Sequence, residues 1–577
     1  MDVSPYLDLK PAPNAVFDNL DERRTRVRFM LPDGDGDWHG MTWQAFADQI
    51  RRIGQYLIDI GIKSGDRVVI FAPNSVEWLS AALATQAVGG VMVPIYGTST
   101  AEHAAYVVEH SGAKAVFTDT EQLLGRVFDG WSAYGEVRKV VTLSDDVEPA
   151  SVLQQVRNGD ASRAPTFGEV EERLTSIDRV FELGASLDDE TPERFDNALD
   201  GVSIDQDGLM LYTSGTTGKP KGVPLTHRNV GTNGNDWLRC NAPLIEEGAV
   251  DLLWLPLSHV FGFGEACLGN TLGFTTYMTD PGSVLGQLET VKPSVFMSVP
   301  RYFEKLCEAA REGAGDRREA IDNLRRITGG SLTFCLSGGA GLSREVKELF
   351  YDADMLIIEG YGLTEASPTL TLNRPDDFDF DTVGKPLPSV DVKIAEDGEI
   401  LARGDSIFNG YHNNPSATAD AFRDDGWLKT GDLGKFTDDG FLQIIGRKKD
   451  ILVTAAGKNI SPAKIETKFD DDPYISHLVV YGDGKKYLTA GVWPNLEVVE
   501  EALDEEPTTR AIRGLIEPRV DEGNADLARY ETIKKFAIIE EPLTVDNGLL
   551  TPTLKVKRND VYDAFEDQFE ALYEEDA

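Results

Sequence analysis

Apolar and polar positions follow two alternating rhythms over the first 120 residues. Short runs rich in β-branched residues predict strands at 67–72, 91–96 and 114–119. Segments with helical spacing of apolar positions lie between them, at 75–88 and 101–110. Asn74 is the expected N-cap of the first of these helices, because Glu77 follows three residues later as in a capping box. Strands that alternate with helices of this length predict βαβ units in a parallel sheet.

The same alternation returns between residues 331 and 367. A strand at 331–339 runs into a glycine-rich turn, a helix follows at 342–350, and a strand at 355–359 leads into the loop 360–367. Ligands of open α/β sheets bind at the carboxyl ends of strands. We therefore expect the turn Ser337–Gly341 and the loop 360–367 to belong to a binding site.

The pattern of predicted elements changes at two places along the chain, and no internal repeat is visible. The acidic stretch 145–205 has few apolar runs and is expected to be a surface excursion. After Gly446 the elements become shorter and mixed, which predicts a domain boundary there. The predicted fold class is α/β: residues 1–446 form a large N-terminal domain of several subdomains, with mainly parallel sheets flanked by helices. Residues 447–577 form a small α+β C-terminal domain.

Charge and composition exclude some classes of protein. The 577 residues include 97 acidic and 56 basic side chains, a formal net charge of −41, and the acidic residues are spread along the chain. Nucleic-acid binding needs a concentrated basic surface, so it is not expected. The excess of acidic over basic residues favours a strongly hydrated surface that stays soluble at high salt, as in the cytoplasm of a halophile. The alternative is an ordinary acidic enzyme.

Cysteines and apolar runs suggest the compartment. The four cysteines have no metal-like spacing and are expected to be buried packing residues in a reducing compartment: Cys240, Cys267, Cys307 and Cys335. No run approaches the ~18 apolar residues that span a bilayer, and the first residues do not resemble a secretory signal. We expect a cytoplasmic protein without a transmembrane segment, for which peripheral membrane contact stays open.

Residues 212–223, YTSGTTGKPKGV, have the composition of a phosphate-binding loop without the pattern of a Walker loop. Thr213 stands where a Walker loop has its first glycine. Pro220 lacks an N–H and disfavours a helix at Lys219. The loop offers hydroxyl, backbone N–H and ammonium groups from Thr213, Ser214, Gly215, Thr216, Thr217, Gly218, Lys219 and Lys221. This set suits a polyphosphate that is held and then released; the alternative is a flexible surface linker.

Seven segments in order make the chain similar to the adenylate-forming superfamily, which includes acyl-CoA synthetases, luciferases and the adenylation domains of peptide synthetases. They are TSGTTGKPKG (213–222), LPLSHVFG (255–262), SGGAGLS (337–343), EGYGLTEAS (359–367), GWLKTGDLG (426–434), GRKKD (446–450) and LTPTLKVKR (550–558). Each is weak alone, and seven in register are specific. The resemblance implies that a carboxylate attacks the α-phosphate of ATP to give acyl-AMP and pyrophosphate, and that coenzyme A then takes the acyl group.

The resemblance also implies roles for residues around the phosphates. Lys555 is the expected main cation of the first step, bridging the carboxylate and the α-phosphate; the alternative is an exposed lysine. Glu365 would bind Mg²⁺ and Thr364 would hydrogen-bond phosphate, although Glu365 could instead be a helix-capping acid. His259 would line the acyl pocket near the reacting carboxylate, against the alternative of a hydrogen-bonded core histidine.

Further residues of the motifs are implied in nucleotide and thiol binding. Tyr361 would stack on adenine, Glu359 would accept from its amino group, and the remaining positions of this pocket are Gly339, Ala340, Gly360 and Gly362. Asp432 would bind the ribose hydroxyls, with Arg447 as a second contact. Lys449 corresponds to the hinge about which the C-terminal domain rotates between the two steps. The segment 454–459 would then face the thiol, through Gly457 and Lys458.

The acyl substrate is expected to be a medium- to long-chain fatty acid. SVPRYFEKL (298–306) and LTPTLKVKR resemble the long-chain branch of the acyl-CoA synthetases, and HVFGF adds apolar lining. Trp237 and Phe261 are candidate gates of the acyl tunnel. Open alternatives are a ligase that loads an acyl carrier protein, an aryl- or other acid–CoA ligase, and a non-catalytic nucleotide-binding regulator. Intact Lys555, Glu365 and Asp432 argue against the regulator, and both a monomer and a homodimer remain open.

Overall fold

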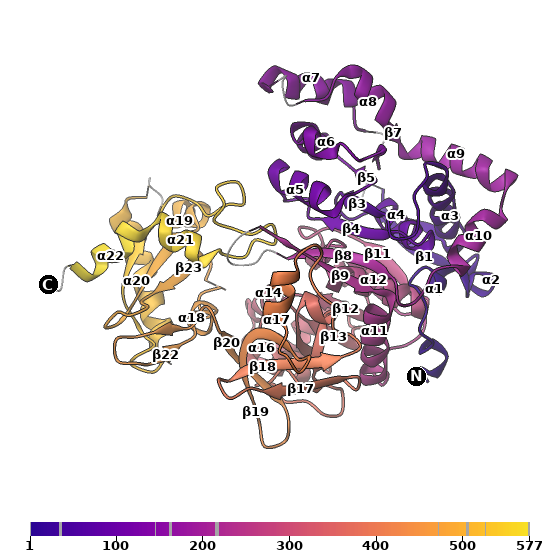
Figure 1. The fold of residues 1–577 in the computed structure, drawn as a ribbon. Helices are drawn as coiled ribbons and strands as arrows, with labels where there is room; N and C mark the ends of the chain where they lie inside the picture. Colours follow the sequence, from indigo (N-terminus) through magenta and orange to yellow (C-terminus); the bar gives the residue numbers. More distant parts are fainter. Residues whose placement is uncertain are drawn as a thin grey trace. The chain divides into compact units, whose positions relative to one another are not determined.

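The computed structural model describes residues 2–33, 37–144, 146–160, 164–213, 219–470, 472–503, 507–525 and 527–574. The chain forms two compact units (Figure 1). The first contains Met1–Val392 and Ala402–Leu428, and the second contains Lys393–Leu401 and Lys429–Ala577. Residue 446, where the sequence suggests a boundary, lies inside the second unit. The predicted α/β class, with large helix-flanked sheets and a smaller mixed C-terminal part, is confirmed.

The first unit contains a seven-stranded sheet that is parallel except at one edge. Its strands, in spatial order, are β7 (Leu174–Ser176), β6 (Lys139–Thr142), β5 (Ala115–Thr118), β3 (Arg67–Phe71), β4 (Val91–Ile95), β8 (Asp207–Thr213) and β9 (Lys221–Thr226). Only β8 and β9 pair antiparallel in the described part of this sheet. The predicted strands at 67–72, 91–96 and 114–119 are thus confirmed as β3, β4 and β5.

Successive residues of β3 face two different cores. Val69 and Phe71 pack with α5 (Ala101–Ser111) and α6 (Glu121–Asp129), whereas Val68 and Ile70 pack with α3 (Trp43–Asp59) and α4 (Val76–Ala87). This is the period of two expected of a strand covered on both faces. Every residue of α4 except Glu77 is buried, so this helix lies inside the unit.

The N-cap of α4 differs by one residue from the prediction. Ser75 accepts the N–H of Trp78, and Asn74 does not cap the helix. The Asn74 side chain instead accepts the N–H of Leu257 and donates to the carbonyl of Leu255, at 2.8 Å each. Asn74 therefore ties the end of β3 to the segment 255–262.

A second, nine-stranded sheet completes the first unit. Its order is β16 (Lys385–Pro386), β15 (Thr369–Leu372), β14 (Ile357–Gly362), β13 (Phe334–Ser337), β12 (Val295–Ser298), β10 (Val250–Leu253), β11 (Thr275–Met278), β1 (Val27–Pro32) and β2 (Trp38–Thr42). The strands from β14 to β1 pair in parallel, and the edges pair antiparallel. The carboxyl ends of β13 and β14 lie side by side in this sheet.

Strand β14 runs farther than the sequence predicts. It continues through Gly362, where a loop from 360 is expected, because it leaves β13 after Glu359 and pairs with β15. A Cβ at Gly362 would stand 1.8 Å from the carbonyl oxygen of Pro368, and one at Gly360 would stand 2.8 Å from a methyl of Leu372. Both glycines are needed for this close approach of β15.

The acidic stretch 145–205 is only partly a surface excursion. It contains α7 (Pro149–Asp160), α8 (Phe167–Arg173), α9 (Ile177–Glu190) and α10 (Glu193–Asp200). Val180 and Phe195 of α9 and α10 are fully buried, and Arg51 of α3 pairs with Asp188 at 2.7 Å and with Asp196 at 2.6 Å. The apolar residues are spaced at helical intervals rather than in runs, which hid this packing in the sequence.

The remaining helices of the first unit cap and cover the sheets. They are η1 (Ser4–Tyr6), α1 (Asn14–Phe17), α2 (Leu20–Arg23), η2 (Trp131–Tyr134), α11 (His227–Asn241), α12 (Val260–Leu272), α13 (Val284–Val291), α14 (Pro300–Arg311), α15 (Arg317–Ile327), α16 (Arg344–Asp352), η3 (Thr364–Ala366) and α17 (Pro415–Ala421). The cysteines expected to be packing residues are indeed inside or partly inside this unit and unbonded to one another.

The second unit has its own small core. A four-stranded sheet runs in the order β17 (Val390–Ile394), β18 (Glu399–Gly404), β19 (Leu428–Phe436) and β20 (Leu442–Arg447), of which residues 390–392, 402–404 and 428 are counted with the first unit. The short pair β21 (Leu452–Val453) and β22 (Asn459–Ile460) follows, then the sheet β23 (Ile475–Tyr481), β24 (Leu488–Pro494) and β25 (Ile533–Ile538). Its helices are α18 (Pro462–Glu466), α19 (Leu496–Leu503), α20 (Thr509–Ala525), α21 (Arg558–Ala564) and α22 (Glu566–Glu574).

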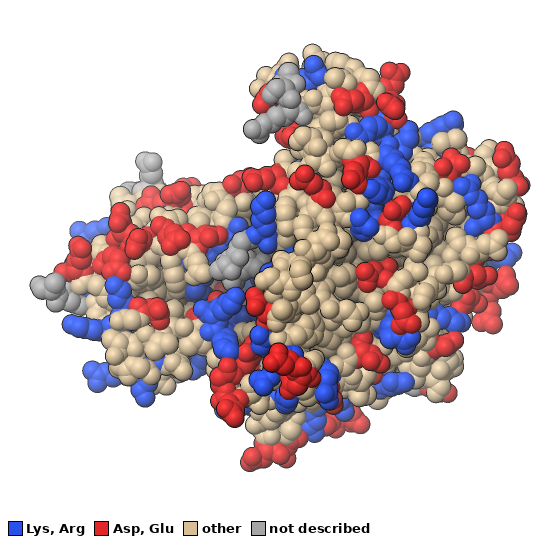
Figure 2. Space-filling view, in the orientation of Figure 1, with Lys and Arg blue, Asp and Glu red and all other residues tan. Residues whose placement is uncertain are grey.

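Acidic side chains are spread over the visible surface of both units rather than gathered in one patch (Figure 2). Within the described ranges, no helix is both long and apolar enough to cross a bilayer.

Candidate active site

The residues that flank the phosphate-loop segment lie at the carboxyl end of β8 and the amino end of β9. Thr213 is the last residue of β8 and Lys221 the first of β9, and they face each other in the antiparallel register. Lys221 Nζ lies 4.7 Å from the ring centroid of Tyr411, and Lys219 Nζ lies 5.2 Å from that of Tyr106. The predicted residues Ser214, Gly215, Thr216, Thr217 and Gly218 lie outside the described residues.

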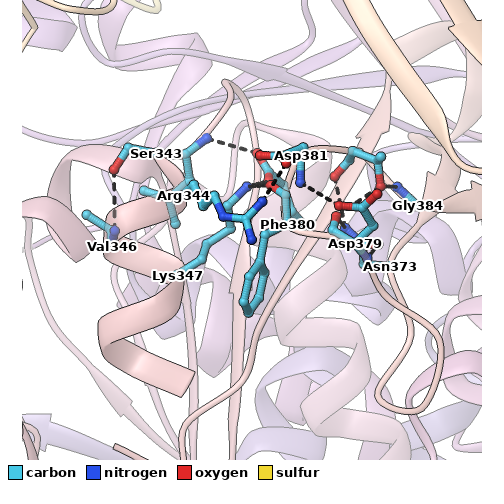
Figure 3. Close-up of polar contacts among 12 residues, drawn as sticks. Ser343, Arg344, Val346, Lys347, Asn373, Asp379, Phe380, Asp381 and Gly384 are labelled. Carbon is cyan, nitrogen blue, oxygen red and sulfur yellow. Dashed lines mark hydrogen bonds and ion pairs between the residues drawn. The ribbon is translucent and has the colours of Figure 1, made fainter. Parts of the chain in front are cut away.

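A buried ion pair supports the turn that precedes α16. Glu359, at the carboxyl side of β14, is 3% exposed; its Oε1 accepts the N–H of Leu342 at 2.9 Å and its Oε2 accepts from Lys347 Nζ at 2.6 Å. Figure 3 shows Lys347 extending from α16 toward the carbonyl of Phe380, to which it also donates. Burial raises the pKa of Glu359, and Lys347 opposes that rise. Glu359 therefore holds the turn at Gly339.

The turn itself has the geometry of a close backbone surface. Gly339 has φ 91°, in the left-handed region that favours glycine, and Ala340 follows it before Leu342. A Cβ on Gly338 would stand 3.0 Å from the ring of Phe261, so the segment 255–262 packs directly against this turn. Tyr361 lies partly exposed on β14 between Gly360 and Gly362. The structure thus brings together the turn and the strand that the sequence assigns to one pocket.

Glu365 is fixed by contacts that the sequence does not reveal. It lies in η3 with Thr364, and its Oε1 accepts from the hydroxyl of Tyr411 at 2.8 Å. Its backbone carbonyl accepts the N–H of Phe408 at 2.9 Å. A carboxylate held through one oxygen presents the other to a ligand.

Two buried asparagines on one face of α11 hold the segments around Glu365. Asn233 donates to the carbonyl of Thr369 at 2.7 Å, and Asn229 donates to those of Asp405 and Ile407 at 2.7 and 3.1 Å. Residues four apart lie on the same face of a helix. In the sequence, the spacing of Asn229 and Asn233 is equally typical of a solvent-exposed helix face. The one sequence feature that points to a buried face is that both side chains are uncharged.

His259 is the N-cap of α12. Its Nδ1 accepts the N–H of Phe261 at 3.1 Å, and the side chain is partly exposed. This contact accounts for the histidine locally and fixes its ring at the start of α12. Trp237 on α11 packs edge-on against Phe334, with ring centroids 5.5 Å apart.

The second unit carries three predicted residues, of which Asp432 and Arg447 are in contact. Asp432 on β19 is 5% exposed and faces Arg447 on β20, with Arg447 Nε 3.0 Å from Asp432 Oδ1. Lys555 keeps exposed surface, yet desolvation of its ammonium and then the Arg447 charge lower its pKa, against the pull of Asp432. Thr551 holds the loop, because its N–H donates to the Lys555 carbonyl at 2.8 Å and its Oγ1 accepts the Lys555 N–H at 3.0 Å.

The predicted hinge and thiol-side residues also lie in the second unit. Lys449 is exposed in the turn that follows β20. Gly457 has φ 73°, with no atom within 4 Å of a Cβ placed there, so its backbone conformation rather than a lack of space favours glycine. Lys458 follows in the same turn, where its N–H donates to Thr454 Oγ1 at 3.2 Å.

The donor set of the first unit fits a metal that arrives with phosphates. Glu365 supplies a hard carboxylate oxygen beside Thr364, and no group of three or more metal-binding side chains occurs among the described residues. Mg²⁺ in nucleotide sites keeps several waters and uses one or two carboxylates plus phosphates. Glu365 would therefore hold Mg²⁺ as part of its ATP complex.

A helix-flanked α/β unit with a glycine-containing turn at the ends of β13 and β14, joined to a small unit carrying Asp432, Arg447 and Lys555, defines the adenylate-forming class. The family model of AMP-binding enzymes matches residues 18–412, and that of the AMP-binding enzyme C-terminal domain matches residues 449–577. The chain therefore belongs to the AMP-binding enzyme family, and the family expected from its motifs is confirmed.

Individual relatives span nearly the whole chain. The chain is similar to the long-chain-fatty-acid–CoA ligase FadD15 of Mycobacterium bovis, at 34% identity covering 93% of each chain. It is 27% identical to the long-chain-fatty-acid–CoA ligase ACSBG2 of Xenopus laevis, covering 94% of this chain and 81% of that one. Its fold is similar to the adenylation domain of a carboxylate reductase of Mycobacterium chelonae, with TM-score 0.79, 21% identity, and 99% and 94% coverage.

Proposed function

We propose that this enzyme activates a medium- to long-chain fatty acid with ATP and transfers the acyl group to coenzyme A. In the first step a carboxylate oxygen attacks the α-phosphorus, the bond to the β-phosphate breaks, and acyl-AMP and pyrophosphate form. In the second step the sulfur of coenzyme A attacks the acyl carbon, AMP leaves, and the thiol proton passes to solvent. The names of the relatives support the acyl class.

Residues of the first unit bind and orient the nucleotide in this proposal. Tyr361 stacks on adenine and the Gly339–Ala340 turn lies along it. Glu359 acts through the turn, because both its carboxylate oxygens already accept hydrogen bonds. Thr213, Thr364 and the loop lysines contact phosphate, and bound Mg²⁺ would neutralise phosphate charge next to Glu365. His259 keeps its ring beside the acyl pocket.

Residues of the second unit act on the reacting groups in turn. Asp432 binds the ribose hydroxyls and Arg447 holds its carboxylate in place. Lys555 supplies positive charge where the carboxylate approaches phosphate, a role in which a preorganised donor strongly lowers the barrier. Lys449 is the pivot, after which Gly457 and Lys458 face the thiol in the second step.

The single observation that carries the proposal is the buried Asp432 carboxylate held by Arg447 at 3.0 Å, in the unit that also carries Lys555. Such a constellation binds a diol and meets an anion, as adenylation requires. The test is AMP release from ATP, measured with a panel of acids from acetate to palmitate, with and without coenzyme A. The proposal expects coenzyme A-dependent AMP release that rises toward longer chains.

Other outcomes of this assay identify the alternatives. AMP release with an acyl carrier protein but not with coenzyme A would identify a carrier-loading ligase, and a preference for benzoate would identify an aryl-acid ligase. No AMP or pyrophosphate release with any acid would overturn the proposal. The setting we propose is a cytoplasm of high salt, which would screen the repulsion between the acidic surface and the anionic coenzyme A.

A further inference from the structure

We propose that Tyr106 and Tyr411 are positioning residues that hold Lys219 and Lys221 in place to meet a polyphosphate. The inference rests on the proposed function and extends it to two aromatic side chains outside the motifs. Each tyrosine ring lies beneath one lysine, and each hydroxyl is bonded to another part of the same site.

Tyr411 connects Lys221 to Glu365. The Lys221 ammonium lies 4.7 Å from the Tyr411 ring centroid, and the Tyr411 hydroxyl donates to Glu365 Oε1 at 2.8 Å. The ring is itself fixed, since it packs edge-on against Phe408 at 4.9 Å and its backbone N–H donates to Thr418 Oγ1 at 2.9 Å. One rigid side chain thus sets the positions of a cation and a carboxylate.

Tyr106 holds Lys219 and the chain next to it. Lys219 Nζ lies 5.2 Å from the Tyr106 ring centroid, and the Tyr106 hydroxyl donates to the carbonyl of Pro220 at 3.0 Å. One turn farther along α5, His110 Nδ1 is hydrogen-bonded to the hydroxyl of Tyr212 at 2.9 Å. The same face of α5 therefore contacts both ends of this segment: β8 through Tyr212, and Pro220, which directly precedes β9.

A tyrosine ring suits this task better than a carboxylate does. The negative face of an aromatic ring attracts an ammonium without adding net charge, so the lysine keeps its positive charge and its N–H groups for phosphate. Within the described residues neither Lys219 nor Lys221 has a carboxylate oxygen within 4.0 Å, although the chain has 97 acidic residues. The rings hold the two cations beside the start of β9, without surface ion pairs among the described residues.

The test uses leucine at both positions, and phenylalanine at position 106, in the full-length protein. A ring contact of this kind corresponds to about a two- to fivefold change in affinity. We expect Tyr106→Leu and Tyr411→Leu each to weaken ATP binding by about that factor in calorimetry, and the double variant by roughly their product. Tyr106→Phe keeps the ring and loses only the hydroxyl contact to Pro220, so it should weaken ATP binding less than Tyr106→Leu does. The KM for ATP in pyrophosphate release should rise with kcat nearly unchanged.

A matched control and a double-mutant cycle separate positioning from general destabilisation. Tyr573→Leu removes a similar contact in the second unit, where Lys485 Nζ lies 5.0 Å from the ring, and should leave ATP affinity unchanged. In a Lys221→Met background, Tyr411→Leu should weaken ATP binding less than it does in the wild type, because the part of its effect that acts through the lysine is already lost. Transfer from supplied acyl-AMP to coenzyme A should be unaffected in both leucine variants.

Several results would overturn the inference. Wild-type ATP affinity in both leucine variants would do so, as would equal losses with Tyr106→Phe and Tyr106→Leu, or a full Tyr411→Leu effect in the Lys221→Met background. If Tyr411→Leu does not fold, the Tyr106 pair of variants alone decides the matter. If the wild type binds ATP and the leucine variants bind it equally well, only this inference is contradicted. A wild-type protein that binds no ATP contradicts the proposed function as well.

Discussion

Replacing Lys347 by methionine tests how the turn at Gly339 is held. The side chains of Lys347 and Glu359 are each 4% exposed, and their charged atoms lie 2.6 Å apart. Lys347→Met would leave the Glu359 carboxylate buried without its cation while it still accepts the Leu342 N–H. Removing one partner of a buried ion pair costs about 3–5 kcal/mol of unfolding free energy. Because Glu359 also supports the turn, the KM for ATP should rise.

The matched control is Arg344→Met on the same helix. Arg344 is 56% exposed and pairs with Glu348 at the surface. It also pairs with Asp381, as Figure 3 shows. Surface ion pairs contribute about 0–1 kcal/mol, so this variant should unfold close to the wild type. The assay is urea unfolding followed by tryptophan fluorescence. The double variant Lys347→Met with Glu359→Gln should recover much of the lost stability, since no buried charge remains.

The pH dependence of Lys347→Met has a defined sign. Burial already raises the pKa of Glu359, and loss of the opposing lysine raises it further. An acid whose folded pKa exceeds its unfolded value binds a proton more readily when folded, so stability falls as pH rises above the unfolded pKa of about 4.5. The deficit should therefore be larger at pH 8 than at pH 5. A pH-independent deficit below about 1 kcal/mol, matching Arg344→Met, would refute the reasoning.

Three further predictions concern other parts of the chain. Glu265 is buried near Asp251, and burial, followed by the Asp251 charge, raises the pKa of Glu265 well above 4.5. The stability of the wild type should therefore fall as pH rises above 4.5, and Glu265→Gln should gain stability relative to the wild type between pH 5 and pH 8 in urea unfolding. A stability difference that stays constant over this pH range would contradict the prediction. The net charge of −41 should make activity and melting temperature rise from dilute buffer toward molar KCl, and a flat or falling melting temperature would contradict the halophilic interpretation. Lys449→Pro fixes φ near −65°, so it should retain part of the pyrophosphate release while acyl-CoA formation is largely lost. If single turnovers give the wild-type ratio of pyrophosphate release to acyl-CoA formation, Lys449 is not the hinge of the C-terminal domain.

Local patterns predicted the elements well because local physics forms them. The strands and helices between residues 67 and 119 follow from runs of β-branched residues and from helical spacing. The N-cap of α4 is Ser75 rather than the predicted Asn74, because the Asn74 side chain is hydrogen-bonded to the backbone of Leu255 and Leu257, about 180 residues away in sequence. No local pattern contains that partner.

The site could be predicted where a motif carries it and not where distant side chains support it. The motifs predict roles for Glu365, Asp432 and Lys555, whereas no motif includes Tyr411 or Asn233. Asn233 bonds a residue 136 positions away, and Tyr411 bonds one 46 positions away. In sequence both are ordinary polar residues, and only the folded chain shows that they are partly or fully enclosed. Long-range hydrogen bonds of this kind leave no periodicity to detect.

Half-reactions of Lys555→Ala test the central claim most directly. Pyrophosphate release from ATP and palmitate reports adenylation, and acyl-CoA formation from supplied palmitoyl-AMP and coenzyme A reports transfer. The account predicts that Lys555→Ala slows the first by on the order of a hundredfold or more, as for loss of one preorganised donor, and leaves the second close to the wild-type rate. Lys557→Ala, two residues away, should leave both rates near those of the wild type. Equal slowing of both half-reactions by Lys555→Ala, or normal pyrophosphate release, would contradict the account.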